Sequence, residues 1–489
     1  MLLNKLSRIL NVTILNRDLF RLITLIVCIV YFMPSTLNIS NIPMKICFLW
    51  GGMLVVYQLL LKKDIYRIPF KICLFMLTIS FLFTILLNRQ YNFLPMMYNF
   101  GYLLISIFVI FPVDFSQSIE VRKNKLIQFN NVFILMIFIA GLISVIQFFM
   151  LLGYRVPTEV AGVTARQGFL EHRLFGVYTS PNVGALFGYC SIVLSFINLL
   201  LLEFKKKKIV FLYLINFITQ VVFNSLSSSR GTQITFVFFL TALLLLFFNK
   251  EFTREMSNSI NTKKIILGTI CLLLFIGVGT SCFKKILGTI PPRYISVTQN
   301  RNDLEGLEET DNSDESNKVP VKVEHSEEGS EISSGRFNIW KGGISVLSQK
   351  PLFGFGELDF FSSSKLNFNK RKLTDQNLIS LEKSHGNMHN GYLQVLLASG
   401  IVGFLIVYVY YALNILSLFK VFLFSGSNRK NISGFNMAFL GVSLILLLSF
   451  FVNELVEVHL LFNKRDVISL IFWYYLGILS TTFLQKKVN

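Results

Sequence analysis

The chain has 489 residues, of which 53% are hydrophobic and only 15% are charged, whereas a water-soluble domain averages about 25% charged residues. The formal net charge of +19 does not indicate nucleic-acid binding, because most Lys and Arg residues lie in short segments between apolar blocks, where they orient helices. The apolar blocks run for about 15–22 residues, the length that crosses a hydrocarbon core of about 30 Å. The composition therefore favours one polytopic membrane protein over a set of soluble domains.

Twelve apolar blocks predict an all-α fold with about twelve transmembrane helices. The first block follows several basic residues, as in a signal peptide, but no small-residue cleavage site follows it, so we expect an uncleaved span. It is also short, which leaves eleven or thirteen spans as alternatives. The cores of the blocks are 22–32, 46–61, 68–87, 93–111, 132–152, 183–202, 209–223, 234–248, 265–283, 392–413, 435–452 and 467–483.

The distribution of Lys and Arg predicts that both termini are cytoplasmic. With the N-terminus inside, the inside segments carry 23 basic residues and the short outside loops carry 8. Cytoplasmic loops are usually the more basic ones. The same orientation places the two long polar segments, 153–182 and 284–391, outside the membrane.

The blocks and loops predict three regions. Residues 1–283 form an N-terminal bundle of about nine spans, 284–391 form a large extracytoplasmic loop between spans nine and ten, and 392–489 hold about three further spans. Within the loop, 302–331 is acidic and nearly free of aromatic residues, so we expect it to be disordered. The remainder, 334–391, carries a helical pattern, and we expect it to be ordered and to contribute to a site.

The cysteines and histidines do not predict a metal site or any other cofactor. The six cysteines lie in or beside apolar blocks without metal-ligand spacing, and a disulfide framework is not expected. His385 and His389 are four residues apart, as two ligands on one helix face would be, but Gly386 weakens a helix there. The alternatives for these histidines are a structural role at the membrane interface or general-base catalysis. The sequence predicts no role for His325 or His459.

Three arginines on the predicted outer side are candidates for binding an anion. Arg230 lies in Ser-Ser-Ser-Arg-Gly at the mouth of a predicted helical hairpin, and Arg336 lies in the first turn of a predicted loop helix. Arg173, beside His172, precedes the Ser-Pro-Asn182 that opens the sixth span. Guanidinium groups bind phosphate oxygens bidentately, so converging arginines suit a phosphate or pyrophosphate. The alternative is an interfacial anchor that contacts lipid headgroups.

The whole chain, most clearly in its second half, resembles the O-antigen ligase and O-antigen polymerase superfamily of bacterial membrane glycosyltransferases. Ligases of this family show His followed by Asn, Ser or Gln, then nine residues and Gly-x-x-Gly. Here His389-Asn390 is followed by nine residues and by Gly400-Ile-Val-Gly403. The usual Thr-Gly continuation of the ligase pattern is replaced by Phe-Leu405. Other family-like features are Arg336-x-x-x-Trp340, Pro351-Leu-Phe-Gly-Phe-Gly356, Ser229-Arg-Gly231 and Ser180-Pro-Asn182.

This resemblance implies a metal-independent, inverting glycosyl transfer at the outer face of the bacterial cytoplasmic membrane. It implies that Arg230 and Arg336 hold the pyrophosphate of an undecaprenyl-pyrophosphate-linked glycan, and that His389 accepts the proton of the attacking hydroxyl. The residues implied to contact substrate are Arg173, Asn182, Trp340, His385 and Asn390, and those implied to allow close helix packing are Gly400 and Gly403.

The predicted function is the polymerisation of lipid-linked repeat units into a surface polysaccharide such as an O antigen or a capsule. The implied partners are the glycan donor, a glycan acceptor, the bilayer, and the flippase and chain-length regulator of the same pathway, but no nucleic acid. One alternative is a ligase that moves the glycan to lipid A-core, a wall polymer or a protein. Another is a lipid-glycan flippase or transporter, although transporters usually place ionisable groups deep within their spans.

Overall fold

A computed structural model describes most of the chain. The described residues are 13–157, 164–202, 204, 207–249, 252–254, 262–290, 321–323, 335–356, 376–424, 435–461 and 465–484. The predicted disordered segment 302–331 lies outside them except for residues 321–323, where the Val321 amide donates a hydrogen bond to the Gly288 carbonyl at 2.9 Å.

The contacts divide the chain into two interleaved units. The first unit comprises Met1–Leu25, Pro43–Lys125 and Gly329–Asn489, and the second comprises Ile26–Ile42 and Leu126–Glu328. Each unit combines segments that are far apart in the sequence.

The predicted α-helical membrane architecture is confirmed at the level of the helices. Among the described residues, eight helices are long and apolar enough to cross a membrane: Ile39–Lys62, Lys71–Gln90, Phe93–Ile110, Ile119–Phe149, Pro181–Leu201, Lys207–Ser227, Gly391–Phe424 and Val467–Leu484. Each overlaps one predicted block, and the other four blocks are also helical. The total of twelve crossings stays a prediction.

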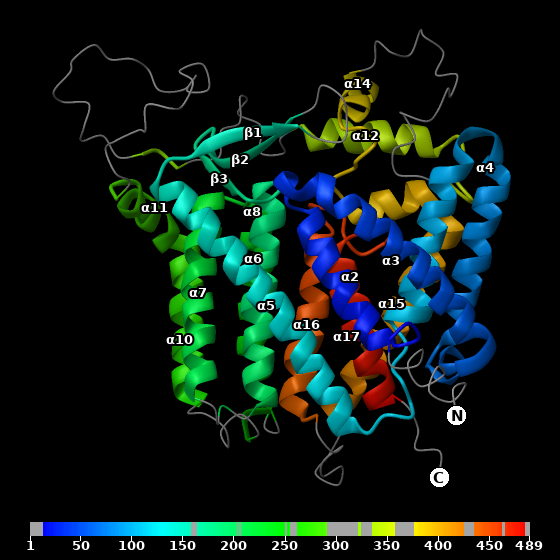
Figure 1. Cartoon of the computed structure of the whole chain (residues 1–489), viewed down its shortest axis with the longest axis horizontal. Coiled ribbons are helices and arrows are strands. Elements are labelled where there is room, and N and C mark those ends of the chain that lie inside the picture. Colours follow the sequence, from blue (N-terminus) through cyan, green and yellow to red (C-terminus); the bar gives the residue numbers. More distant parts are fainter. Residues whose placement is uncertain are drawn as a thin grey trace. The chain divides into compact units, whose positions relative to one another are not determined.

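The first unit contains the helices that carry its candidate site (Figure 1). In chain order its elements are most of α2 (Arg17–Tyr31) and α3 (Leu37–Tyr57), η2 (Gln58–Lys62), η3 (Asp64–Arg67), α4 (Lys71–Ile105), η4 (Ser106–Ile110), α12 (Arg336–Leu347), α14 (Gln376–Lys383), α15 (Gly391–Phe424), α16 (Met437–Asn453), α17 (Val467–Leu479) and η9 (Ser480–Leu484). Helices α12 and α14 lie across one end of the α4, α15, α16 and α17 bundle.

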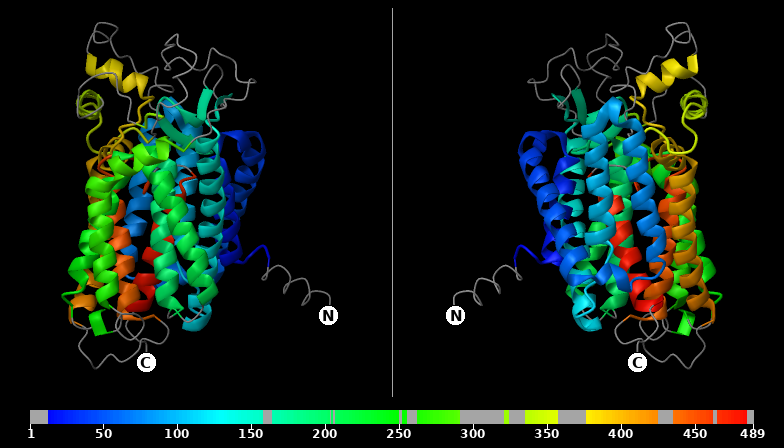
Figure 2. Two further views of the ribbon diagram at one scale, coloured as in Figure 1. Left: turned by 90° about the vertical axis from the view of Figure 1, so that its left-hand side faces the viewer. Right: turned by 90° about the vertical axis from the view of Figure 1, so that its right-hand side faces the viewer.

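Helix α4 folds back on itself. Residues 19 positions apart would lie about 29 Å apart along a straight helix, yet the ring centroids of Phe81 and Phe100 are 6.2 Å apart. The two arms, Lys71–Gln90 and Phe93–Ile110, therefore lie side by side (Figure 2). They correspond to the two separate blocks predicted at 68–87 and 93–111.

Helix α15 is interrupted at Gly400, whose backbone is left-handed at φ 65°. The break frees amides and carbonyls that a continuous helix would pair, and these groups need other partners. The turn at residues 351–356 supplies them through four backbone hydrogen bonds: Phe355 N to Leu397 O, Gly356 N to Ala398 O, Ile401 N to Pro351 O and Val402 N to Leu352 O. The turn thus pairs backbone groups that the break in α15 leaves without helical partners.

The two glycines predicted to allow close helix packing have different neighbours. A Cβ atom at Gly400 would collide with the carbonyl oxygen of Leu352, so the close approach there comes from the turn and not from a helix. A Cβ atom at Gly403 would first meet the Ser399 side chain on the same helix at 2.5 Å, and the Oγ of Ser80 on α4 would lie 3.7 Å away. Only glycine combines this space with a positive φ at position 400.

The second unit packs its membrane helices beneath a small sheet (Figure 1). Its elements are η1 (Pro34–Thr36), most of α5 (Ile119–Phe149), β1 (Gly153–Pro157), β2 (Thr164–Leu170), β3 (Arg173–Gly176), α6 (Pro181–Leu201), α7 (Lys207–Ser227), α8 (Arg230–Leu246), α10 (Thr262–Leu274), η5 (Phe275–Gly279) and α11 (Thr280–Gly288). Strand β3 contacts both α6 and α7.

The sheet departs from the purely helical prediction. Its strands are antiparallel in the order β1-β2-β3, and Leu170 pairs with Arg173 across a two-residue turn. Glu171 and His172 in that turn have φ values of 50° and 59°, as a tight hairpin turn of type I′ requires. Such turns usually carry Asn-Gly or Asp-Gly, so Glu-His leaves no recognisable signal in the sequence.

Candidate functional site

A carboxylate joins two of the predicted catalytic residues in the first unit. Glu457 Oε2 lies 3.5 Å from His389 Nδ1, and Glu457 Oε1 lies 3.5 Å from the guanidinium of Arg336. The side chains of Arg336, His389 and Glu457 are 25%, 36% and 20% exposed. The cluster is therefore anchored in the protein yet open to a ligand. Its members come from the first turn of α12, the loop before α15 and the loop after α16.

The backbone of the loop that carries His389 is fixed by hydrogen bonds with the side chains of Trp340 and Gln394. Trp340 Nε1 on α12 donates to the Met388 carbonyl at 2.8 Å, and the Met388 amide donates to Gln394 Oε1 at 2.8 Å. Gln394 Nε2 in turn donates to the Gly386 carbonyl at 3.2 Å. Two helices thus hold the loop while His389 keeps a left-handed backbone at φ 45°.

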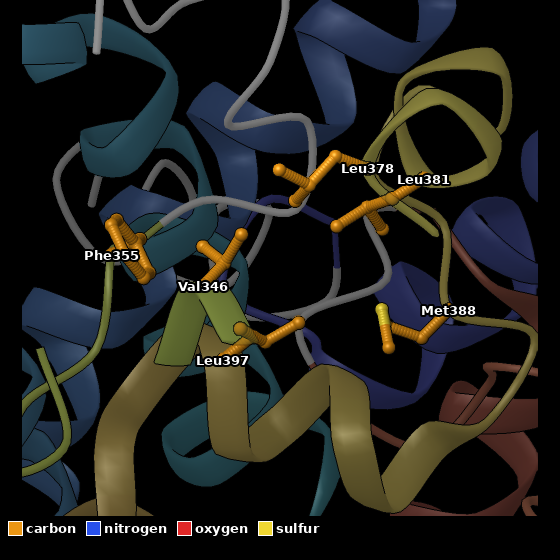
Figure 3. Close-up of a cluster of buried hydrophobic side chains, with 6 residues drawn as sticks. All are labelled: Val346, Phe355, Leu378, Leu381, Met388 and Leu397. Atoms are coloured by element: carbon orange, nitrogen blue, oxygen red, sulfur yellow. The ribbon is translucent and has the colours of Figure 1, made fainter. Parts of the chain in front are cut away.

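A hydrophobic cluster also anchors the loop that carries His389. The Met388 side chain points into a group of buried residues contributed by α12, α14, α15 and the turn at 351–356 (Figure 3). Trp340 packs against this group. The cluster comprises Val346, Phe355, Leu378, Leu381, Met388 and Leu397. In this arrangement Trp340 supports the loop through both its ring and its N–H group.

The loop after α16 is tied to the start of α15. The Gly391 amide donates to the Glu454 carbonyl at 2.7 Å, and Asn390 Nδ2 donates to the Leu455 carbonyl at 3.1 Å. Asn390 Oδ1 also accepts from the Leu393 amide, which is the N-cap interaction of a helix start. These contacts set His389 opposite Glu457.

The charges around Glu457 favour its ionised form. Burial raises the pKa of this carboxyl, but the hydrogen bond and charge of His389, together with the charges of His459 and Arg336, outweigh burial and leave the pKa below its usual value. Such a carboxylate can accept a hydrogen bond from Nδ1 of His389 when that nitrogen carries the proton. That tautomer leaves Nε2 as a proton acceptor.

A second group of polar side chains, His459, Asp466 and Glu454, is buried near the Arg336–His389–Glu457 cluster. His459 Nδ1 is 2.8 Å from Asp466 Oδ2, and the Glu454 Oε1 atom accepts from the His459 amide at 2.7 Å. Burial lowers the pKa of His459, but the charge and hydrogen bond of Asp466 outweigh it and raise the pKa to about 9. Burial raises the pKa of Glu454 to about 7. His459, for which the sequence predicts no role, is therefore part of the support of the site.

The His459–Asp466 pair should make the stability of the protein depend on pH. Because the folded-state pKa of His459 is raised from 6.5 to about 9, its stabilisation is complete below about pH 6.5 and is lost as pH rises through about 9. We therefore expect the melting temperature to fall over that range in a detergent thermal-shift measurement. Asp466→Asn, which keeps a capping oxygen for α17, should flatten the slope.

The exposed His385 provides the control for this measurement. His385→Gln should leave the pH dependence of the melting temperature as in the wild type. A slope that Asp466→Asn leaves unchanged would show that another group carries the effect.

In the second unit, the structure brings together Arg173 and Asn182. The Arg173 Nε atom donates to the Ser227 carbonyl at 3.0 Å, and its terminal nitrogen lies 3.2 Å from Asn182 Oδ1. Arg173 thereby holds the turn that precedes α8. Arg230 is the first residue of α8 and is exposed.

The remaining predicted residues are placed as follows. His385 is exposed and has a left-handed backbone. Arg230 belongs to the second unit and Arg336 to the first, so their convergence on one pyrophosphate stays a prediction. Within the described part of the chain, no three His, Cys, Asp or Glu side chains are grouped so that they could hold a metal ion.

Glu457 is the functional candidate that sequence reasoning missed. It lies 68 positions after His389, and only the packing of α16 against the start of α15 brings the two together. One signal was available in the sequence: Glu454, Glu457 and His459 follow directly on an uncharged apolar block. Ionisable groups at the end of a span are often functional.

Part of the chain matches the model of a known protein family. Residues 215–408 match the O-antigen ligase family. The match confirms the predicted resemblance to the O-antigen ligase and polymerase superfamily. The matched segment includes Arg230, Arg336 and His389 and ends before Glu457. No curated protein matches the chain.

Proposed function

We propose that this protein polymerises undecaprenyl-pyrophosphate-linked oligosaccharide repeat units into a surface polysaccharide at the outer face of the cytoplasmic membrane. The observation that carries the proposal is the cluster of Arg336, Glu457 and His389. It combines a cation for a phosphate group with a histidine whose Nε2 can accept a proton. The O-antigen ligase match of 215–408 supports lipid-linked glycan transfer as the class of reaction.

In the proposed reaction, a hydroxyl oxygen of the acceptor sugar forms a bond to the anomeric carbon of the donor sugar. The bond from that carbon to the pyrophosphate oxygen breaks, and its electron pair leaves with undecaprenyl pyrophosphate. The hydroxyl proton passes to Nε2 of His389, and the Glu457 carboxylate stabilises the resulting imidazolium. Arg336 and Arg230 stabilise the negative charge that develops on the leaving group.

A second candidate function is ligation of the finished glycan to another acceptor. The matched family carries the description O-antigen ligase, which favours this alternative. Against it, Phe404 and Leu405 stand where the ligase pattern continues with Thr-Gly. The same cluster would serve both reactions, because they differ in the acceptor and not in the bond that is made.

The acceptor test separates the two functions. Purified protein is incubated with a lipid-linked repeat unit, either alone or with lipid A-core, and the products are separated by gel electrophoresis. We expect a ladder of longer lipid-linked glycans from the repeat unit alone. Product that forms only with lipid A-core would identify a ligase. If wild-type protein makes neither product but exchanges the repeat unit across a vesicle membrane, the enzyme proposal is wrong.

A further inference from the structure

The turn at residues 351–356 is bound to α4 as well as to α15. Thr84 Oγ1 donates a hydrogen bond to the Phe353 carbonyl at 2.7 Å. Asn88 Nδ2, one helical turn further along α4, donates to the Gly354 carbonyl at 3.0 Å. The first arm of α4 therefore supplies donors to two successive carbonyl groups of the turn.

Burial makes these two contacts strong restraints on the turn. Thr84 and Asn88 are 0% and 1% exposed, and a carbonyl group that loses its donor in a buried setting is costly to leave unpaired. Asn88 uses both ends of its amide, because its Oδ1 atom accepts a hydrogen bond from Lys350 Nζ. Asn88 therefore holds both the turn and the residue that precedes it.

The second arm of α4 contacts the end of the same turn. Asn99 Nδ2 lies 3.3 Å from the carbonyl oxygen of Gly356. A Cβ atom at Gly356 would lie 2.5 Å from Sδ of Met96, so the turn and this arm are closely packed. Both arms of α4 thus contribute to the position of the turn.

The turn is continuous with the C-terminal end of α12. The Lys350 amide donates to the Leu347 carbonyl at 2.9 Å, and the Gly354 amide donates to the Lys350 carbonyl at 3.1 Å. Val346 of α12 and Phe355 of the turn belong to the same hydrophobic cluster (Figure 3). We therefore expect a displacement of the turn to move the end of α12 with it.

Helix α12 connects the turn to the candidate site. Arg336 is the first of its 12 residues, and a helix of this length is a rod of about 18 Å. A tilt of the rod at the turn therefore changes the position of Arg336 beside Glu457, which it approaches at 3.5 Å. A misplacement of about 1 Å at a reacting centre can cost about 10²-fold in rate.

We propose that Thr84 and Asn88 are positioning residues that hold Arg336 in place beside Glu457, through the turn and α12. The proposal rests on the proposed function, because it takes Arg336 to bind the pyrophosphate of the donor. Neither Thr84 nor Asn88 touches the substrate in this role. No local motif indicates the role, since Thr84 lies 269 positions before the carbonyl group that it holds.

The test compares two substitutions of one hydroxyl group. Thr84→Val keeps the shape of the side chain and removes its O–H group, whereas Thr84→Ser keeps the O–H group. Initial rates of the full-length protein are measured over a range of lipid-linked donor concentrations. We expect Thr84→Val to raise KM for the donor about tenfold, the usual effect of one lost hydrogen bond, and Thr84→Ser to stay within about twofold of the wild type. Equal KM values in the two variants would overturn the proposal.

Thr78 on the same arm of α4 is the matched control. Its Oγ1 atom donates to the Leu74 carbonyl of its own helix at 2.9 Å, so Thr78→Val removes a hydroxyl group that does not hold the turn. It should leave KM unchanged, and a rise equal to that of Thr84→Val would contradict the positioning role.

Asn88→Asp tests the second contact and serves as an alternative should Thr84→Val fail to fold. It keeps the shape of the side chain and an oxygen for Lys350, but it loses the N–H donor to Gly354. We expect it to raise KM as Thr84→Val does. A KM equal to that of the wild type would show that this contact does not position Arg336.

A double variant separates positioning of Arg336 from general damage to the fold. In an Arg336→Lys background the planar fork is already lost, so the addition of Thr84→Val should change KM by less than about twofold. Effects of the two substitutions that multiply would show that Thr84 acts independently of Arg336, and the proposal would be wrong.

Hydrogen exchange tests the same coupling without any reaction. The Phe355 and Gly356 amides, which donate to α15, should exchange faster in Thr84→Val, as should the amides of α12, whereas Thr78→Val should match the wild type. If Thr84→Val loosens α12 but wild-type protein makes no glycan product, the proposed function fails and the coupling stands. If glycan is made but exchange in Thr84→Val is unchanged, only the coupling is refuted.

Discussion

His389→Ala should reduce polymer formation by about 10²–10⁴-fold, the usual contribution of a general base. The lipid-linked repeat unit should still bind, because the arginines that are proposed to hold its pyrophosphate remain. Activity should fall because His389 is the proposed base: its Nδ1 atom lies 3.5 Å from Glu457, which leaves its Nε2 atom for the acceptor hydroxyl. Polymer yield per mole of membrane-inserted protein is the measurement.

His385→Ala is the matched control, since this histidine lies four residues earlier in the same loop but is not in contact with Glu457 in the described cluster. His385→Ala should lower activity less than His389→Ala does. Glu457→Gln should lower the rate through His389, and the double variant with His389→Ala should be no slower than His389→Ala alone, because the two residues act as one unit. Unchanged yield and chain length in a stable His389→Ala protein would remove the residue on which the glycosyltransferase proposal depends.

Arg336→Lys should lower activity on the order of 10²-fold, comparable to the removal of one preorganised donor at a developing negative charge. Lysine keeps the positive charge, but it lacks the planar fork that binds two phosphate oxygens at once. Arg336 approaches Glu457 at 3.5 Å, a distance that leaves the guanidinium free to turn toward a substrate. Initial rates at saturating and limiting lipid-linked donor measure the effect on binding and on the chemical step.

Lys341 on the same helix provides the control, because it is exposed and belongs to no described cluster of the site. Lys341→Met should retain normal rates. The same loss in Lys341→Met and Arg336→Lys would point to surface charge on α12. Near-normal activity of Arg336→Lys would reduce Arg336 to a headgroup anchor.

The sequence alone determined which segments form apolar helices. Each apolar block has to satisfy its own backbone hydrogen bonds in lipid, where water is absent, and a helix achieves this within the block. The local composition of a block is therefore sufficient to predict that it is a helix, and all twelve predicted blocks are helical. The same local information placed His389, Arg336 and the Gly400-x-x-Gly403 pattern in a recognisable family order.

Interactions between distant segments were decided only by the tertiary structure. Nothing near Gly400 in the sequence indicates that the turn at 351–356 would pair with the broken helix, because that pairing depends on backbone groups that every residue carries. The hairpin turn at Glu171 and His172 likewise adopts left-handed geometry without the residues that usually announce it.

The residues of the candidate site likewise fall into those that the sequence predicted and one that only the structure revealed. His389 and Arg336 were predicted from local motifs, because the chemistry of proton acceptance and phosphate binding restricts the residue types. Glu457 was not predicted, since its role depends on the 3.5 Å separations from both residues, which arise only when α12, α15 and α16 pack together. Sequence determined which helices form and which side chains they carry, whereas packing between those helices determined which side chains meet.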